Sequence, residues 1–436
     1  MIPPSDRDAI RHELARARAR TRSLVDDLSD DDQRAQHSPI MSPLVWDLAH
    51  VGNYEERWLL RALDGRPPVD PAIDWLYDAF EHPRSTRPSL PLLDPVAARA
   101  YLTTVREETL GLLEIVDELD APELLRGGYV YGMVLQHEHQ HDETMLATRQ
   151  LMGERAPSVP GARPVLGQRA RVPSGEVLID GGPFVMGTTS EPWGYDNERP
   201  AHLVEVPPFR LDRTLVANRD FLAFIDDGGY QHEQLWRPRG WAFRCEQGLE
   251  HPLFWQRDGT DSWSILRFGR KIDLAEHLDD PVQHVCWFEA DAFARWAGKR
   301  LPTEAEWEKA ATWNPDGTKT RYPWGDQAPD PDRANLGGHV DGPCPAGTTA
   351  SGASPAGVHQ LIGDVWEWTS SDFVPYPGYE MFPYPEYSEV FFGGDYKVLR
   401  GGSWASDPLA VRGTFRNWDH PIRRQIFAGF RCARDA

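Results

Sequence analysis

The sequence predicts two domains, an N-terminal four-helix bundle over residues 1–152 and an irregular α+β domain over residues 174–436. A chain of 436 residues is longer than one hydrophobic core usually supports. Up to about residue 152 apolar side chains recur at helical spacing, whereas short strand-like runs alternate with Gly, Pro and Asn from residue 174 onward. Residues 153–173 are rich in Pro, Gly and Arg and lack an apolar period, which is typical of a linker.

Four segments carry the helical pattern of the first domain. The first spans residues 5–28, and the second begins at Ser42-Pro43, a serine N-cap followed by proline at the first helical position, and runs to about residue 59. The third and fourth cover about 94–118 and 128–152. With a long connection at 62–93, these lengths predict a four-helix bundle.

The second domain alternates short strands with short helices. We expect strands at 177–179, 184–186 and 202–206, and helices at 218–227, 289–297 and 303–311. Turns rich in Gly and Trp dominate the remainder. Loops therefore outweigh regular elements, as in an irregular α+β fold.

Composition excludes several classes of partner. The net charge of −21 argues against nucleic acid or an anionic membrane surface, although local Arg clusters can still bind a small anion. No run of about 18 apolar residues predicts a membrane span, and residues 1–20 lack a secretory signal. Four cysteines without a CxxC motif fit a reducing compartment. We expect a cytoplasmic monomer that acts on small molecules.

Two histidines in the fourth helical segment form the clearest candidate site. His137 and His141 are four residues apart, which places them on one face of a helix, in a stripe of buried apolar residues. Two buried imidazoles are costly unless a ligand satisfies them. His50, in the second segment, could supply a third ligand across the bundle core, whereas His139 points roughly the opposite way. The pattern predicts one metal ion.

Two other interpretations of these histidines stay open. His50 taken alone is more often an ordinary core histidine. The run from His137 to His141 also matches the HExxH pattern of zinc proteases, with Glu138 as general base, but no further ligand follows at a suitable spacing. Three imidazoles suit zinc or iron, so spacing does not choose the metal.

Motifs in both domains carry a family resemblance. The first domain contains SPLVWDLAH at 42–50 and HEHQHDET at 137–144. The second contains GGPFVMG at 181–187, NERP at 197–200, RLPTEAEWE at 300–308, YPWGD at 322–326, GDVWEW at 363–368, RGGSW at 400–404 and GFRCA at 429–433. Taken together and in this order, these motifs resemble those of the ergothioneine-biosynthetic sulfoxide synthases. The resemblance implies a DinB-like bundle followed by a formylglycine-generating-enzyme (sulfatase-modifying factor) domain related to C-type lectins.

The resemblance also implies a reaction. Such enzymes use Fe(II) and O2 to join a sulfur donor to hercynine (Nα-trimethylhistidine) and oxidise the sulfur to a sulfoxide. Fe(II) would be held by His50, His137 and His141. Formylglycine generation is not expected, because residues 414–421 contain no cysteine. The chain ends at Ala436 without the added methyltransferase of ovothiol synthases, which favours the ergothioneine branch.

By the same resemblance, a set of side chains would handle the substrates. Tyr384 would be the proton donor and Tyr387 would line the hercynine pocket. The donor γ-glutamylcysteine would be bound by Arg84, Arg87, Asp419 and Arg423, and hercynine by Gln140, Asn417 and Trp418, the indole facing the trimethylammonium group. Simpler explanations are aromatic packing for the tyrosines, a solvated loop for Arg84 and Arg87, and an ion pair between Asp419 and Arg423.

Three alternatives to this function remain. Free cysteine could replace γ-glutamylcysteine as the sulfur donor. A zinc-dependent thiol transferase or hydrolase on a DinB-like bundle would need no O2. A non-enzymatic module whose lectin-like domain binds a ligand would keep binding after loss of the three histidines.

Overall fold

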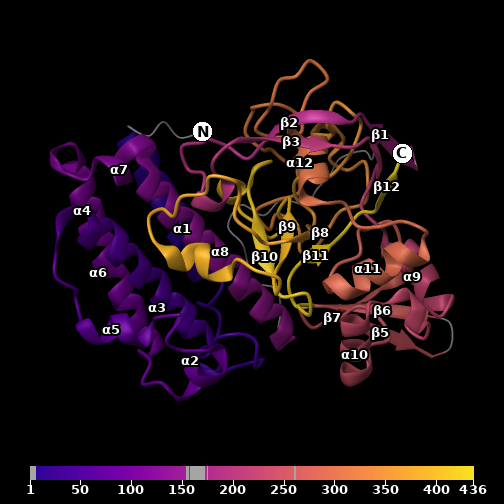
Figure 1. Ribbon diagram of the computed structural model, residues 1–436. Coiled ribbons are helices and arrows are strands. Elements are labelled where there is room, and N and C mark those ends of the chain that lie inside the picture. Colours follow the sequence, from indigo (N-terminus) through magenta and orange to yellow (C-terminus); the bar gives the residue numbers. More distant parts are fainter. Residues whose placement is uncertain (1–5, 154–156, 158–171, 174, 260–261) are drawn as a thin grey trace. The chain divides into compact units, whose positions relative to one another are not determined.

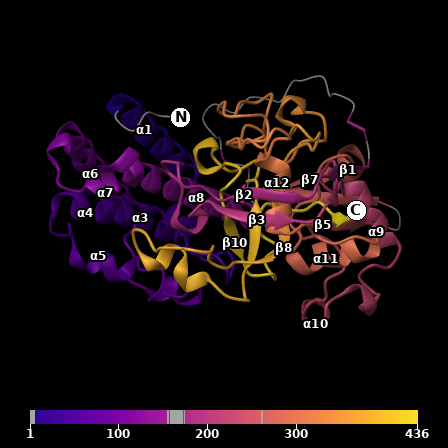
Figure 2. The same ribbon diagram turned by 45° about the horizontal axis from the view of Figure 1, so that its top comes forward.

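Long helices build the N-terminal part of the protein (Figures 1 and 2). A computed structural model describes residues 6–153, 157, 172–173, 175–259 and 262–436, and the chain divides into two compact units, Met1–Gly161 and Ala162–Ala436. The predicted linker at 153–173 lies largely outside the described residues. The long helices of the first unit are α1 (Arg7–Ser23), α3 (Leu44–Glu55), α6 (Pro95–Glu114) and α8 (Tyr129–Met152).

Local sequence explains where two of these helices begin. The Asp6 carboxylate accepts a hydrogen bond from the Ala9 amide at the start of α1. Asp94 does the same for α6, and Pro95 occupies the first helical position, where its missing N–H costs nothing. Shorter helices lie between the long ones: α2 (Asp30–Arg34), α4 (Ala62–Asp64), α5 (Pro71–Leu76) and α7 (Pro122–Leu125).

The start of α3 differs from the prediction by one residue. Pro43 is the cap, no side chain caps the helix, and the Ser42 hydroxyl instead accepts a hydrogen bond from Arg87. At its other end α3 continues into a π-helix, η1 (Glu56–Arg61). A π-helical turn widens the helix and is frequent near functional sites. Here the consecutive Glu55 and Glu56 are both buried, and each carboxylate has its own set of partners.

A buried cluster of charges joins the long helices of the bundle. Arg18 of α1 contacts Glu55 of α3 at 2.7 Å and Glu138 of α8 at 2.8 Å. Arg106 of α6 contacts the same two carboxylates at 2.7 and 3.0 Å. Each helix thus contributes one member, and the positive and negative charges balance.

Strands and loops characterise the second unit. Its strands are β1 (Glu176–Ile179), β2 (Gly182–Met186), β3 (His202–Val206), β4 (Phe209–Asp212), β5 (Trp255–Asp258), β6 (Ser262–Arg267), β7 (Arg270–Asp273), β8 (Trp366–Asp372), β9 (Lys397–Arg400), β10 (Asn417–Asp419), β11 (Ala428–Gly429) and β12 (Ala433–Asp435). They form sheets in the orders β1-β4-β12, β10-β9-β8-β11, β2-β3 and β5-β6-β7. β8 pairs antiparallel with β9 and parallel with β11.

The helices of this unit are α9 (Asn218–Asp226), α10 (Pro238–Gln247), α11 (Trp287–Trp296) and α12 (Glu304–Thr312). α9 and α11 lie side by side in both views (Figures 1 and 2). The Thr303 side chain caps α12 in a capping box with Glu306. The predicted fold class, a helical part followed by an α+β part, is confirmed. The sequence did not predict α10 or the β5-β6-β7 sheet, because this stretch lacks a sustained apolar period.

The motif residues of the second unit bind one another. Arg400 contacts Glu304 and Glu308 at 2.7 Å each, and Arg416 contacts Glu304 at 2.7 Å. Arg431 binds Glu367 in the same way at 2.6 Å. These side chains are buried. Arg416 lies between the RGGSW and GFRCA motifs, and the others belong to the RGGSW, RLPTEAEWE, GFRCA and GDVWEW motifs. Their partners account for the motifs without any catalytic role.

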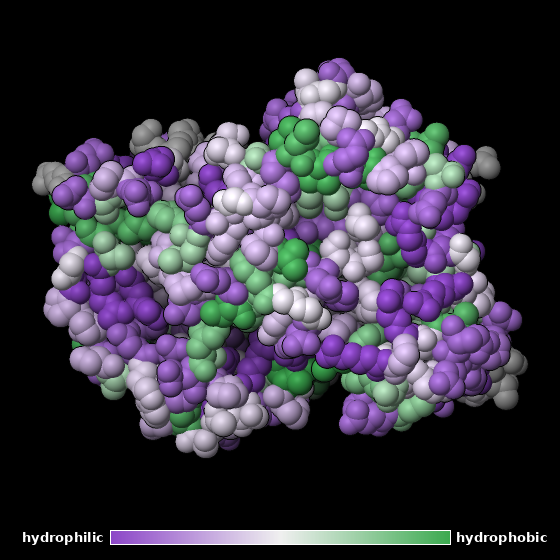
Figure 3. Space-filling model, in the orientation of Figure 1, coloured by the Kyte–Doolittle hydropathy of each residue, from purple (hydrophilic) through white to green (hydrophobic). Residues whose placement is uncertain are grey.

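The outer surface is mixed. Hydrophilic residues cover most of the face in Figure 3, with smaller hydrophobic areas between them. Among the helices that the structure describes, none has the length and apolarity needed to cross a membrane.

Replacing Glu308 with glutamine should destabilise the second unit. Lys319 and Arg400 outweigh the effect of burial and lower the pKa of Glu308 to about 2. Breaking a buried ion pair by neutralising one of its members costs about 3–5 kcal/mol, so urea unfolding at neutral pH should show a loss of that size. The loss should shrink as the pH falls below the ordinary carboxyl range toward 2, because the unfolded chain takes up this proton first.

The matched control is Asp435→Asn, which removes a solvent-exposed partner of Arg300. Its effect should stay within about 1 kcal/mol. Equal losses in the two variants would contradict a special contribution of the buried pair.

Candidate metal centre

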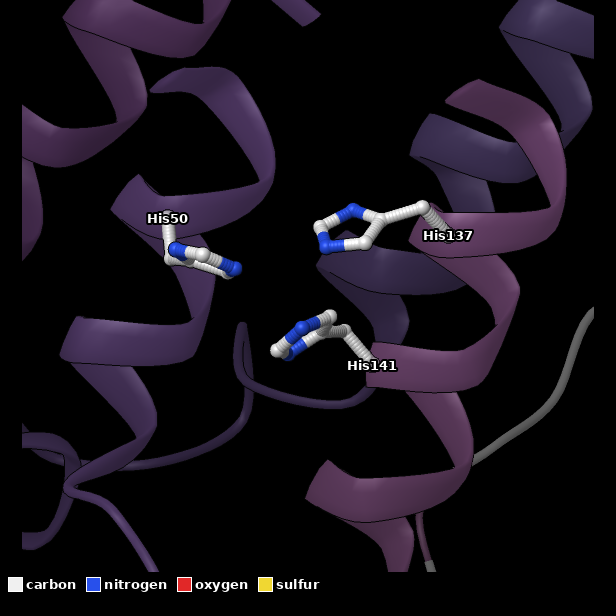
Figure 4. A group of neighbouring side chains, drawn as sticks. All are labelled: His50, His137 and His141. Atoms are coloured by element: carbon white, nitrogen blue, oxygen red, sulfur yellow. The ribbon is translucent and has the colours of Figure 1, made fainter. Parts of the chain in front are cut away.

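Three histidines from α3 and α8 face a common space (Figure 4). One nitrogen from each of His50, His137 and His141 lies within 4.8 Å of the others. The ring centroids are 4.6–5.1 Å apart. Of the described residues, these three are the one set of His, Cys, Asp or Glu that comes together in a way that could hold a metal ion.

Each histidine is held by a different contact. The Tyr77 carbonyl lies 2.8 Å from His50 Nδ1, and the Asp47 carboxylate lies 2.9 Å from His141 Nδ1. His137 instead stacks on the ring of Tyr54, with centroids 3.6 Å apart. For His50 and His141 the engaged Nδ1 leaves Nε2 as the atom available for a metal.

The environment keeps two of the three imidazoles neutral. Burial, followed by repulsion from His141, holds the pKa of His50 and of His137 well below the usual range. A neutral imidazole is the form that binds metal ions. The buried Nδ1 of His137 has no hydrogen-bond partner among the described residues. Three convergent nitrogen donors, two of which are kept neutral, therefore fit a transition metal such as iron or zinc.

Neighbouring polar residues of α8 lie on a different face of the helix. Glu138 binds Arg18 and Arg106, and these cations outweigh burial and lower its pKa to about 2. His139 is buried and lies 3.1 Å from Asp142, so its predicted exclusion from the site agrees with the structure. With its carboxylate occupied by two guanidinium groups, Glu138 is not placed as the general base of an HExxH protease.

The predicted arginines of the first unit differ in exposure. Arg87 is buried over the Trp46 ring, at 3.5 Å from its centroid, and donates to the carbonyls of His82 and Ala79 and to Ser42. Burial lowers its pKa to about 10. Arg84 is half-buried in the same 3-10 turn, and Gln140 is half-buried on α8. The Arg87 guanidinium thus donates its hydrogen bonds to residues of the first unit itself.

The predicted residues of the second unit lie close to one another. Tyr387 stacks on Tyr195 at 3.9 Å between centroids and lies 6.4 Å from Tyr384 and 5.7 Å from Trp418. Trp418 also stacks on Phe373 at 4.1 Å. The structure therefore brings Tyr384, Tyr387 and Trp418 into one aromatic cluster.

The polar members of this group lie on β10 and just after it. Arg423 contacts the Asp419 carboxylate at 3.2 Å, as the simpler explanation of their spacing proposed. The Nη1 atom of Arg423 is buried and has no hydrogen-bond partner in the described part of the chain. Asn417 accepts a hydrogen bond from the Trp418 amide. Asp419 and Arg423 thus form a half-buried charged pair with a spare donor.

The sequence reasoning missed the residues that support the histidines. Trp46, His50 and Tyr54 follow one another at intervals of four, and both aromatic rings stack on a histidine of the site. Asp47 is an acidic residue between the apolar residues Trp46 and Leu48, which is a signal for a buried charge with a specific partner. Tyr77 acts through its carbonyl, so its side chain carries no such signal.

Replacing Glu138 with glutamine should destabilise the bundle without emptying the metal centre. The change leaves Arg18 and Arg106 with one carboxylate fewer, which should lower the free energy of unfolding by about 3–5 kcal/mol. Metal bound per chain at saturation should stay the same, because Glu138 is not one of the ligands. A stable variant that no longer holds metal would instead place Glu138 in the metal centre.

Comparisons with known proteins agree with the two-part organisation. The DinB superfamily model matches residues 13–145, and the model of the sulfatase-modifying factor enzyme 1-like domain matches residues 162–436. The hercynine oxygenase of Mycolicibacterium thermoresistibile is 51% identical over 445 residues, covering 98% of this chain and 95% of that protein. Those of Mycolicibacterium smegmatis and Mycobacterium tuberculosis are each 50% identical, covering 98% and 97% of this chain and 99% and 97% of theirs.

These similarities extend over nearly the whole length of both partners, so the predicted resemblance and the predicted class, an oxygen-dependent oxidoreductase, are confirmed. The chain belongs to the hercynine oxygenase family, in which a DinB-superfamily part precedes a sulfatase-modifying factor enzyme 1-like part.

Proposed function

We propose that this protein is an iron(II)- and O2-dependent enzyme of ergothioneine biosynthesis that joins γ-glutamylcysteine to hercynine and oxidises the sulfur to a sulfoxide. The observation that carries the proposal is the group of three convergent histidines in a chain half identical to hercynine oxygenases along its length. The histidine group supports the metal, and the relatives' name supports hercynine as a substrate.

The metal would be held by His50, His137 and His141. When bound, iron(II) would supply the redox chemistry that makes O2 reactive toward a thiol and an imidazole. A site with three protein ligands leaves coordination positions for other molecules, which is the arrangement that catalytic metal sites share. The nonpolar helix faces and stacked aromatic rings around the histidines would limit the access of water.

Tyr384 would supply a proton during oxygen reduction. A phenol has a pKa near 10, so its hydroxyl carries a proton at neutral pH and can donate it. Its neighbours Tyr387 and Trp418 offer aromatic faces, which attract a trimethylammonium cation such as that of hercynine. The aromatic cluster of the second unit therefore suits one substrate and the proton that its reaction needs.

Charged side chains would recognise the sulfur donor. Asp419 can pair with an α-ammonium group, and the spare Nη1 of Arg423 can bind a carboxylate. Both groups are present in a γ-glutamyl moiety. Arg84 and Arg87 would add positive charge for carboxylates, and Gln140 and Asn417 would hydrogen-bond the hercynine carboxylate. Free cysteine offers fewer groups to these residues, so γ-glutamylcysteine is the proposed donor.

Iron-loaded protein should consume O2 only when hercynine and a thiol are both present. We expect γ-glutamylcysteine to give a higher kcat/KM than cysteine, because it engages the Asp419–Arg423 pair. O2 uptake and mass spectrometry of the product measure this. A preference for cysteine would reassign the donor, and turnover with zinc under anaerobic conditions would identify a thiol transferase instead.

Replacing Tyr384 with phenylalanine should slow sulfoxide formation. Loss of a positioned proton donor typically costs about 10²–10⁴-fold in rate, and thiol oxidation should take a larger share of the O2 consumed. The control is Tyr396→Phe, since Tyr396 is another half-buried tyrosine of this region and stacks on His420. Unchanged rate and product ratio in Tyr384→Phe would remove the hydroxyl from the mechanism.

A further inference from the structure

The groups that contact the three histidine rings differ in charge. His50 meets a neutral backbone carbonyl, His137 meets an aromatic face, and His141 meets the carboxylate of Asp47. Asp47 comes from α3, the helix that also carries His50, and so reaches across to a ligand on α8. Asp47 thus places an acidic side chain against one of the three imidazoles.

Asp47 is itself unusually placed. It is 1% exposed and lies on the first turn of α3. Its Oδ1 atom lies 2.9 Å from His141 Nδ1, whereas its Oδ2 atom is buried and has no hydrogen-bond partner among the described residues. A buried carboxylate with one hydrogen bond is costly unless positive charge lies near.

Arg87 supplies positive charge near Asp47. The Arg87 guanidinium, which covers Trp46, lies near enough to interact electrostatically with the carboxylate. Its hydrogen bonds, however, go to His82, Ala79 and Ser42 and not to Asp47. A metal cation bound to Nε2 of His141 would lie on the far side of the imidazole ring from the Asp47 carboxylate and would supply the missing positive charge.

We propose that Asp47 is a positioning residue for the metal centre, which fixes the ring of His141 with Nε2 toward the metal and strengthens it as the most electron-donating of the three ligands. This inference rests on the metal site of the proposed function. A carboxylate that accepts from Nδ1–H fixes the tautomer and raises the basicity of the other nitrogen, and loss of such a partner typically lowers metal affinity by 10–100-fold.

Helix α8, which carries His141, also contains a comparable His–Asp pair that does not contact the proposed metal ligands. His139 Nδ1 lies 3.1 Å from Asp142, and both side chains are fully buried. Asp142 also lies 2.7 Å from the Thr21 hydroxyl. Asp47→Asn and Asp142→Asn therefore make the same chemical change in the same kind of pair, once beside a ligand and once away from the site.

Affinity for Fe(II) alone, measured anaerobically on the full chain by competition with a chromogenic chelator, tests the proposal. We expect Asp47→Asn to lower affinity by about 10–100-fold and Asp142→Asn to change it by less than about 3-fold. Co(II) absorption bands should shift in Asp47→Asn and not in Asp142→Asn. Asp47→Glu, which keeps the charge, should recover part of the affinity.

Thermal unfolding without metal separates this role from simple loss of structure. Asp47→Asn should melt within a few degrees of the wild type without metal and gain less from added Fe(II), because the carboxylate acts on the loaded site. Wild-type affinity and spectrum in Asp47→Asn would overturn the inference, as would equal loss of affinity in Asp142→Asn. Failure of the wild type to bind Fe(II) would sink the proposed iron enzyme, and the Co(II) comparison would still decide the role of Asp47.

Discussion

A balanced cluster of two guanidinium groups and two carboxylates lies where the long helices of the bundle meet, and the geometry of the candidate metal centre depends on it. Arg18, Glu55, Arg106 and Glu138 come from α1, α3, α6 and α8 in turn. A buried cluster of this kind adds little net stability over apolar packing, but leaving one member unpaired costs about 3–5 kcal/mol. A helix that slipped along its axis would incur that cost. The cluster therefore favours one register of α3 against α8.

That register is what brings the histidines together. Glu55 lies on α3 C-terminal to His50, and Glu138 is the next residue after His137 on α8. The contacts that position these two carboxylates therefore also position the imidazoles. The residues of α8 divide into two faces at intervals of four. His137 and His141 face the candidate metal site, while Glu138 and Asp142 face α1, where the Thr21 hydroxyl lies within 2.9 Å of both.

This division explains what the sequence could and could not predict. The interval between His137 and His141 is enough to place both on one helix face, and the switch from helical to strand-like patterns is enough for the fold class. The HExxH match fails because Arg18 and Arg106, which lie far away in sequence, hold the Glu138 carboxylate. The partners of Asp47 and Arg87 depend equally on long-range packing.

The second unit shows the same dependence on buried charge. Its motifs look like candidate active-site sequences because they concentrate Arg and Glu, yet Glu304, Glu308, Arg400 and Arg416 form ion pairs with one another in the core. The residues proposed for the chemistry are half-buried ones on β10 and on the loops near it in sequence, including Tyr384, Trp418 and Arg423. Loops can present functional side chains when a rigid scaffold positions their ends, and these buried ion pairs stabilise that scaffold. In both units, then, buried pairs of opposite charge hold the backbone that carries the candidate site residues.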